Sequence, residues 1–263
     1  MLGYFAASGP NVSAGRFVSI DPVRALDTRT TDLVPSGWVA HRPAGETVVV
    51  PRTTAVPASG VAALVLNVTS TASTVPGFLR AQPTGTVTSS STVNYVAGVD
   101  SANMVIVPVG ADGTVSVYTN NPSHIVVDVT GYITDGSAVA STAGLFVPVP
   151  TARASDTRLD PTDGLSLGST RTVQLTGLAA PLPNVAAGAS AVSLNLTAVD
   201  GAGPGFLVAF PSGTTRPPTS SVNFTATDPV ANGGLLKLST GGALDVFSNQ
   251  TADFVIDVNG YFT

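Results

Sequence analysis

Residues 125–132 read Ile-Val-Val-Asp-Val-Thr-Gly-Tyr, and residues 254–261 read Phe-Val-Ile-Asp-Val-Asn-Gly-Tyr. Apolar residues run almost continuously through both stretches, which is typical of a strand in the centre of a sheet. The aspartate is a polar exception in each, and the glycine near the end predicts a bend. The two stretches lie 129 residues apart.

Outward from these stretches, a shift of 128 to 129 residues relates motifs along the whole chain. The matched segments include Asp27-Thr28-Arg29 with Asp156-Thr157-Arg158, Leu66-Asn67-Val68-Thr69 with Leu194-Asn195-Leu196-Thr197, Gly77-Phe78-Leu79 with Gly205-Phe206-Leu207, and Val93-Asn94-Tyr95 with Val222-Asn223-Phe224. The two halves are therefore homologous. Gly3-Tyr4-Phe5 also matches Gly260-Tyr261-Phe262. We expect a remnant of a preceding repeat at residues 1–6, repeats at 7–134 and 135–263, and a chain that is the C-terminal part of a longer protein.

Each repeat is predicted to be all-β. Short runs rich in Val, Ile, Thr and aromatic residues alternate with Gly, Pro, Asn, Asp and Ser turns, and helical periodicity is absent. In the first repeat we expect strands near residues 17–20, 46–50, 61–69, 77–82, 91–96, 103–109, 113–118 and 124–133. About eight strands in a repeat of this length predict two tandem antiparallel β-sandwich domains of jelly-roll-like type.

The composition excludes several classes of function. The 263 residues contain no Cys and two His, so thiolate zinc sites, iron–sulfur clusters and thiol nucleophiles are excluded, and a histidine-built metal site is disfavoured. The chain has 11 Lys and Arg against 16 Asp and Glu, a net charge of −5, and no basic cluster. A nucleic acid or an anionic membrane is therefore not the expected partner, and no apolar run is long enough for membrane insertion.

The repeated Asp-Thr-Arg motif has two interpretations. Asp27 with Arg29, and Asp156 with Arg158, place a carboxylate beside a guanidinium, which can bind sugar hydroxyls or a charged ligand. In the structural interpretation, which we favour, the motif ties the first strand to the rest of the domain. Pairs such as Arg29 with Asp128 and Arg158 with Asp257 would serve this role, since a partly buried charge needs a partner.

A loop of the first repeat holds the only Trp of the chain. Trp38 is followed by His41 and Arg42, and the second repeat has no aromatic residue near the corresponding place. An exposed Trp38 would give the first domain a platform for a sugar ring, with His41 and Arg42 as polar neighbours. In the alternative interpretation, the indole closes one end of the sandwich.

The residues available for catalysis are few. His41 aligns with Thr170 and His124 with Asp253, so neither histidine belongs to the repeated design and a Ser–His–Asp arrangement is not expected. Glu46 is the only Glu, and no spacing selects a pair of carboxylates for glycoside hydrolysis. No cofactor is expected, and no Asp-rich loop indicates a structural Ca²⁺ site. Asn67 and Asn195, although within Asn-x-Thr, are expected to hydrogen-bond neighbouring backbone.

The combination of Leu26-Asp27-Thr28-Arg29, Asn67-Val68-Thr69, Gly77-Phe78-Leu79 and the closing Asp257-Val258-Asn259-Gly260-Tyr261-Phe262 resembles a tandem module of secreted and surface proteins of actinobacteria. In those proteins the module accompanies signal peptides or hydrolase domains. The resemblance covers both halves of the chain, with Ser155 and Ile133 as mild departures. It implies a secreted, extracellular or cell-surface accessory module.

These observations predict a noncatalytic binding module whose partner is a polysaccharide or cell-envelope glycan, attached to upstream domains of the same chain. Tandem copies of a binding domain add avidity. The second hypothesis is a structural spacer or adhesin stalk of a surface protein. The third is a glycoside hydrolase, which would require a cleft with two carboxylates at catalytic separation.

Overall fold

The computed structural model describes residues 9, 11–30, 33, 40–159, 164–179, 182–226 and 228–263. The predicted remnant at residues 1–6 and the loop residue Trp38 lie outside these ranges. The described residues form β-strands, turns and one short 3₁₀ segment. None of them forms a helix long and apolar enough to cross a membrane.

The described residues of the first half form eight strands, close to the predicted ranges. They are β1 (Phe17–Asp27), β2 (Thr47–Val50), β3 (Val61–Thr71), β4 (Gly77–Pro83), β5 (Val93–Tyr95), β6 (Ser101–Pro108), β7 (Val115–Thr119) and β8 (His124–Thr134). The main difference is β1, which was expected near residues 17–20. The strand continues to Asp27, with one register shift between Ser19 and Val23 that spans Pro22 and a second between Arg24 and Leu26.

The second half repeats this arrangement. Its elements are β9 (Phe146–Asp156), the 3₁₀ segment η1 (Thr157–Leu159), β10 (Thr170–Gln174), β11 (Ala191–Val199), β12 (Gly205–Pro211), β13 (Val222–Phe224), β14 (Val230–Lys237), β15 (Ala243–Ser248) and β16 (Asp253–Phe262). All strand pairs within the sheets are antiparallel.

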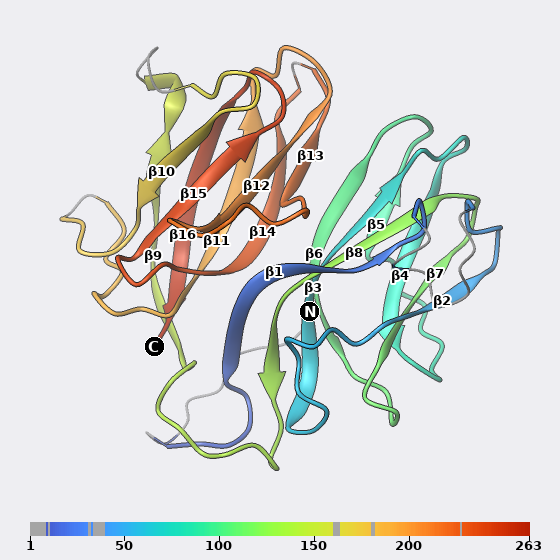
Figure 1. The fold of residues 1–263 in the computed structure, drawn as a ribbon, viewed down its shortest axis with the longest axis horizontal. Coiled ribbons are helices and arrows are strands. Elements are labelled where there is room, and N and C mark those ends of the chain that lie inside the picture. Colours follow the sequence, from blue (N-terminus) through green and yellow to red (C-terminus); the bar gives the residue numbers. More distant parts are fainter. Residues whose placement is uncertain are drawn as a thin grey trace.

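The strand order is the same in both halves and confirms the predicted fold class. The first half has sheets β1-β8-β3-β6 and β2-β7-β4-β5, and the second has β9-β16-β11-β14 and β10-β15-β12-β13. Two four-stranded sheets that exchange strands in this order form a jelly-roll sandwich. Figure 1 shows the two sandwiches side by side, with β1 and β14 between them.

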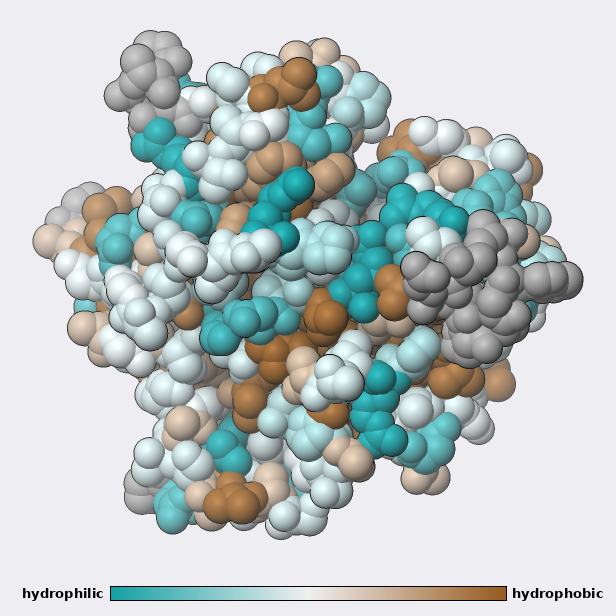
Figure 2. Space-filling view, in the orientation of Figure 1, coloured by the Kyte–Doolittle hydropathy of each residue, from teal (hydrophilic) through white to brown (hydrophobic). Residues whose placement is uncertain are grey.

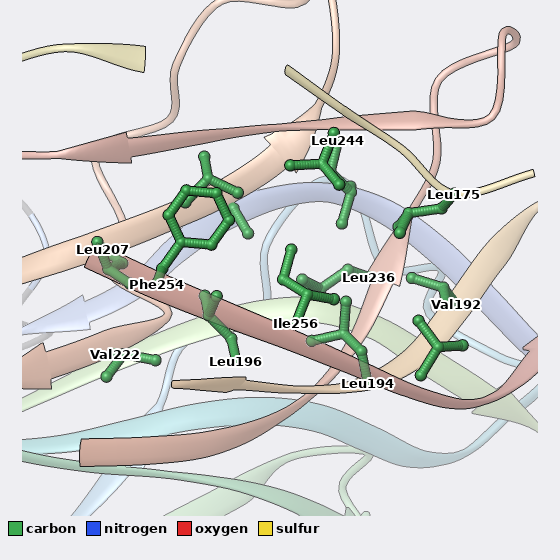
Figure 3. Packing of buried hydrophobic residues seen from close by; sticks show 14 of the residues in the cluster. Leu175, Val192, Leu194, Leu196, Leu207, Val222, Leu236, Leu244, Phe254 and Ile256 are labelled. Atoms are coloured by element: carbon green, nitrogen blue, oxygen red, sulfur yellow. The ribbon is translucent and has the colours of Figure 1, made fainter. Parts of the chain in front are cut away.

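Each sandwich has its own apolar core. In the second, Leu194 and Leu196 alternate with outward-facing residues along β11, and Phe254 and Ile256 do the same along β16 (Figure 3). They meet Leu207 and other side chains of the opposite sheet. Burying one such side chain stabilises the fold by about 1.5–3 kcal/mol.

A third apolar cluster joins the two sandwiches. It consists of buried Phe17, Val65, Ala191, Leu235 and Phe262, surrounded by Met104, Ile106, Ile133 and Phe146. The ring centroids of Phe17 and Phe262 lie 4.7 Å apart, and those of Phe146 and Phe262 lie 5.3 Å apart. Outward-facing residues of β1, β3, β6 and β8 thus pack against those of β11, β14 and β16.

The segment between the sandwiches is tied down by Arg16. Its guanidinium donates hydrogen bonds to the carbonyl oxygens of Val139 at 2.7 Å and Ala143 at 3.3 Å. The backbone of Gly144 bonds to both halves, accepting from the N–H of Phe17 at 2.9 Å and donating to the carbonyl of Thr263 at 2.6 Å. These bonds fix the connection as part of the folded structure. On the face shown in Figure 2, weakly polar residues predominate, with strongly hydrophilic ones scattered among them.

Candidate functional site

The first Asp-Thr-Arg motif forms an ion-pair cluster at the end of β1. Asp27 accepts hydrogen bonds from the backbone N–H of Arg29 at 3.1 Å, from its Nε at 2.9 Å and from its Nη2 at 2.7 Å. Burial raises the pKa of the Asp27 carboxyl, but the hydrogen bonds and charges of Arg29, with the charge of Arg24, outweigh burial and lower it. Asp27 and Arg29 thus satisfy one another.

The arginine that reaches across to β8 is different from the expected one. Arg24, not Arg29, binds Asp128 through Nε at 2.8 Å and Nη2 at 3.2 Å, and its Nη1 also binds Asp27 at 3.1 Å. The pairing of Arg29 with Asp128 was wrong because Arg24 is the residue directly opposite Asp128 in the β1–β8 register.

The second repeat builds the same cluster, so the expected pairing of Arg158 with Asp257 was also wrong. Arg153 binds Asp257 at 3.0 and 3.3 Å and Asp156 at 2.7 Å, while Arg158 binds Asp156 at 2.8 and 2.7 Å. The hydrogen bond from Arg158 is the largest cause that lowers the pKa of Asp156 to about 2. We call Arg24, Asp27 and Asp128 the first triad, and Arg153, Asp156 and Asp257 the second triad.

The two triads differ in exposure although their internal geometry is the same. The side chain of Arg24 is 14% exposed and that of Arg153 is 46% exposed. The second sandwich covers the first triad, where the backbone N–H of Ser220 donates to Asp128 at 3.1 Å. Burial raises the pKa of Asp128. Both triads tie their first strand to their last, as the structural interpretation of the motif requires.

His41 and Arg42 lie near the first motif, at the beginning of β8. The ring of His41 stands edge-on to that of His124, with centroids 4.3 Å apart, and His124 Nδ1 hydrogen-bonds Thr28 Oγ1 at 3.0 Å. Burial, followed by the neighbouring His41, lowers the pKa of His124. Arg42 is buried and pairs through its backbone with Ser123. The structure therefore brings together His41, Arg42 and the Asp27–Arg29 motif.

A separate cleft of about 580 Å³ lies between the two sandwiches. It was not predicted. From the first sandwich it is lined by Arg24, Arg29, Gly98, Val99 and Asp100, and from the second by residues that include Phe206, Arg216, Pro217, Ser220, Asn223, Phe224 and Asn249. Of the predicted site residues that the structure describes, Arg29 alone also lines this cleft.

Phe206 and Arg216, which line the cleft, both contact the ring of Phe247 behind them. The rings of Phe206 and Phe247 lie 6.3 Å apart at 43°, and Arg216 Cζ stands 3.8 Å from the centroid of the Phe247 ring. This distance is within the range of a cation–π interaction. Asn249 accepts a hydrogen bond from the backbone N–H of Phe206 at 2.6 Å, which fixes its side chain beside Phe206.

The first sandwich carries the same grouping at the corresponding strands. The rings of Phe78 and Tyr118 lie 6.0 Å apart at 43°, and Arg80 Cζ stands 4.3 Å from the Tyr118 centroid. Arg80 lies on β4, whereas Arg216 lies in the loop between β12 and β13. The two repeats therefore place a guanidinium on equivalent aromatic pairs from different positions in the sequence.

The polar groups of the cleft include three guanidinium groups and two amides, from Arg24, Arg29, Arg216, Asn223 and Asn249. Among the described residues that line it, Asp100 is the only carboxylate and histidine is absent. Glycoside hydrolysis normally needs two carboxyl groups. Across the described parts of the chain, no three His, Asp or Glu side chains gather in a way that could hold a metal ion.

One residue of this site, Phe206, could have been found from the sequence. Phe206 precedes Leu207 in a strand, and alternation places Phe206 on the outer face once Leu207 is in the core. Arg216 and Asp100 carry no such signal, because their position depends on how the two sandwiches pack.

Searches with this chain matched no protein-family model, no curated protein and no solved structure.

Proposed function

We propose that this chain is a noncatalytic binding module for a polysaccharide or cell-envelope glycan, and that the glycan binds in the cleft between the sandwiches. The observation that carries the proposal is the joining of aromatic side chains, Phe206 and Phe224, to guanidinium and amide groups in a cleft of about 580 Å³. Small-molecule sites have volumes of about 300–1,000 Å³ and combine apolar walls with a few polar groups.

The chemistry of these side chains fits a sugar ring. The C–H face of a sugar packs on an aromatic ring such as Phe206, while hydroxyl groups bond to neighbouring polar side chains. Arg216 and Asn223 supply donors from the second sandwich, and Asp100 supplies an acceptor from the first. A ligand in this position would contact both sandwiches. A secreted or cell-surface location, within a longer protein, belongs to the same proposal and rests on the resemblance of the motifs.

Affinity electrophoresis of the full chain against a panel of cell-wall and storage polysaccharides tests the proposal. We expect retardation by at least one of them, and Phe206→Ala should weaken it by about tenfold, since a lost stacking contact costs about 1 kcal/mol or more. Phe78→Ala is the matched control, because Phe78 occupies the equivalent position in the first repeat and does not line the cleft.

Three results would count against the proposal. The first is that no polysaccharide retards the wild-type chain. The second is that Phe206→Ala, shown to be folded by circular dichroism, binds as well as wild type. The third is an equal loss in Phe78→Ala, which would place binding on the outer face of each sandwich instead of in the cleft.

One structural feature favours the second candidate, a spacer. The apolar cluster around Phe17 and Phe262 and the bonds of Arg16 to the connecting segment hold the two sandwiches in one arrangement. A spacer of this kind would project another domain at a defined angle. Small-angle scattering that gives one fixed interdomain distance, together with absence of glycan binding, would favour it.

A further inference from the structure

In the first sandwich, two side chains hold the backbone of a single residue of the second sandwich. Asn67 Nδ2 donates to the carbonyl of Ser220 at 2.6 Å, and Asp128 accepts from the N–H of the same residue at 3.1 Å. Asn67 and Asp128 are directly opposite one another on β3 and β8. We call this pair the first clamp; it binds an extended segment by its backbone amide and carbonyl.

In the occupied clamp, Asn67 bonds to the second sandwich and not to its neighbour Thr69. Its Oδ1 accepts a hydrogen bond from Asn232 at 2.8 Å, and both ends of the amide thus point to the second sandwich. Thr69, two residues along β3, has a buried hydroxyl that makes no hydrogen bond among the described residues. The clamp in its occupied form therefore leaves one buried polar group on the outer face of β3 without a hydrogen bond.

The second sandwich contains the same clamp in an open form. Asn195 and Asp257 are directly opposite one another on β11 and β16. Here Asn195 Nδ2 donates to Thr197 Oγ1 at 3.2 Å, whereas the equivalent bond from Asn67 to Thr69 is absent in the first sandwich. Asp257 is held by Arg153, and 28% of its side chain is exposed to solvent. The same Asn–Asp pair is thus occupied by a backbone segment in the first sandwich and unoccupied in the second.

The first sandwich also contains a free copy of the segment that the clamp holds. Ser91 stands where Ser220 stands in the repeat, and it is exposed. The following residue is fixed identically in both copies. Thr92 N donates to the Leu79 carbonyl at 2.8 Å, and Ser221 N to the Leu207 carbonyl at 2.7 Å.

An asparagine on the strand that follows each segment, Asn103 on β6 and Asn232 on β14, completes this match. Asn103 Nδ2 donates to the Thr92 carbonyl at 2.8 Å, as Asn232 Nδ2 does to the Ser221 carbonyl at 2.8 Å. The Ser91 segment is therefore already held in the conformation that a clamp binds, so little ordering entropy is lost on docking.

We propose that Asn195 and Asp257 form a binding site for an extended peptide segment, and that its occupant is the Ser91 segment of a second copy of this chain. Within one chain, the Phe17–Phe262 cluster and the Arg16 bonds hold the sandwiches with the first clamp occupied and the second open. The open clamp and the free segment lie on different sandwiches, so each chain can give one segment and receive another. Such head-to-tail contacts build open chains of molecules when rotation does not close them.

Sedimentation equilibrium of the full chain, from micromolar to millimolar concentration, tests the proposal. We expect concentration-dependent association. Ser91→Pro removes the N–H that Asp257 would accept and should weaken association by about tenfold or more, because a hydrogen bond to a charged group is lost. Ser89→Pro, in the same exposed segment, is the matched control and should leave association near wild type.

Asp257→Asn tests the receiving side, with Asn259→Ala as its control on the same strand, where the side chain is exposed. A chain that stays monomeric at all concentrations would overturn the proposal. So would association that survives both Ser91→Pro and Asp257→Asn. As a direct measure, a synthetic peptide of residues 88–96 should shift the NMR signal of the Asn195 side-chain amide, and the same peptide N-methylated at Ser91 should not.

Discussion

Asp128 and Asp257 make the same two hydrogen bonds to an arginine, at 2.8 and 3.2 Å in the first repeat and 3.0 and 3.3 Å in the second. Their side chains nevertheless differ in exposure, at 1% and 28%. The difference arises because the second sandwich lies over Asp128 and donates the Ser220 N–H to it. One residue type in one local geometry therefore occupies two electrostatic environments.

This difference predicts unequal costs for the same substitution. Asp128→Ala should lower the free energy of unfolding by about 3–5 kcal/mol, because it leaves the mostly buried Arg24 without that partner. Asp257→Ala should cost about 1 kcal/mol or less, since Arg153 is solvated. Urea denaturation of both variants gives the comparison, and equal costs would contradict this account of the triads.

The histidine pair predicts a loss of stability in mild acid. The pKa of His124 is lowered from 6.5 by burial and by His41, so the unfolded chain binds more protons than the folded one just below pH 6.5. The contribution of His124 is complete above pH 6.5 and is lost as the pH falls through that value toward the folded pKa. Thermal unfolding at neutral pH and at mildly acidic pH measures it. His124→Asn should flatten the dependence, and a slope that is unchanged in this variant would assign the effect to other groups.

A side chain at Gly131, at the bend of β8, is expected to clash with its neighbours. A Cβ at this position would overlap the ring of Phe17 and lie 2.6 Å from the carbonyl oxygen of Val18. Gly131→Ala should therefore destabilise the protein by about 1–3 kcal/mol or more. Gly136→Ala is the control, because nothing lies within 4 Å of a Cβ there. A Gly131→Ala variant with wild-type melting temperature would show that Phe17 can move aside freely.

The hydrogen bonds of Arg16 are expected to protect the connecting segment from proteases. Arg16→Ala removes the hydrogen bonds to Val139 and Ala143, so residues 136–143 should open locally more often. A protease that cuts after alanine and valine should then cleave this segment several times faster. The control variant Arg52→Ala, which changes an exposed arginine, should be cleaved at the wild-type rate. Equal rates in both variants would mean that other contacts restrain the segment.

The strands could be predicted from the sequence because their periodicity and turns are local properties. The exception, β1, passes Pro22 by irregular pairing that only its partner strand determines. The arginine that pairs with Asp128 was missed because cross-strand register decides it, and the sequence indicates register weakly at such irregularities.

The cleft could not be predicted, because residues that are equivalent in the two repeats have different surroundings there. Phe78 and Phe206 share a motif, yet only Phe206 lines the space between the sandwiches. That asymmetry comes from the packing of one domain on the other, through Phe17, Phe262 and their neighbours. His41 and Arg42, which were predicted separately from Asp27, lie near it because the end of β1 pairs with the beginning of β8.

The guanidinium on each aromatic pair has a consequence for tracing this module through evolution. Arg80 and Arg216 would occupy different columns of an alignment of the two repeats, where Val208 stands in the column of Arg80. Such an alignment would therefore show the positive charge of Arg80 as lost in the second repeat and that of Arg216 as gained there. In the structure, however, the arginine Cζ stands 4.3 Å from the centroid of the Tyr118 ring in the first repeat and 3.8 Å from that of the Phe247 ring in the second. Distant copies of the module are therefore better sought by the location of a cation over a ring than by the identity of any single position.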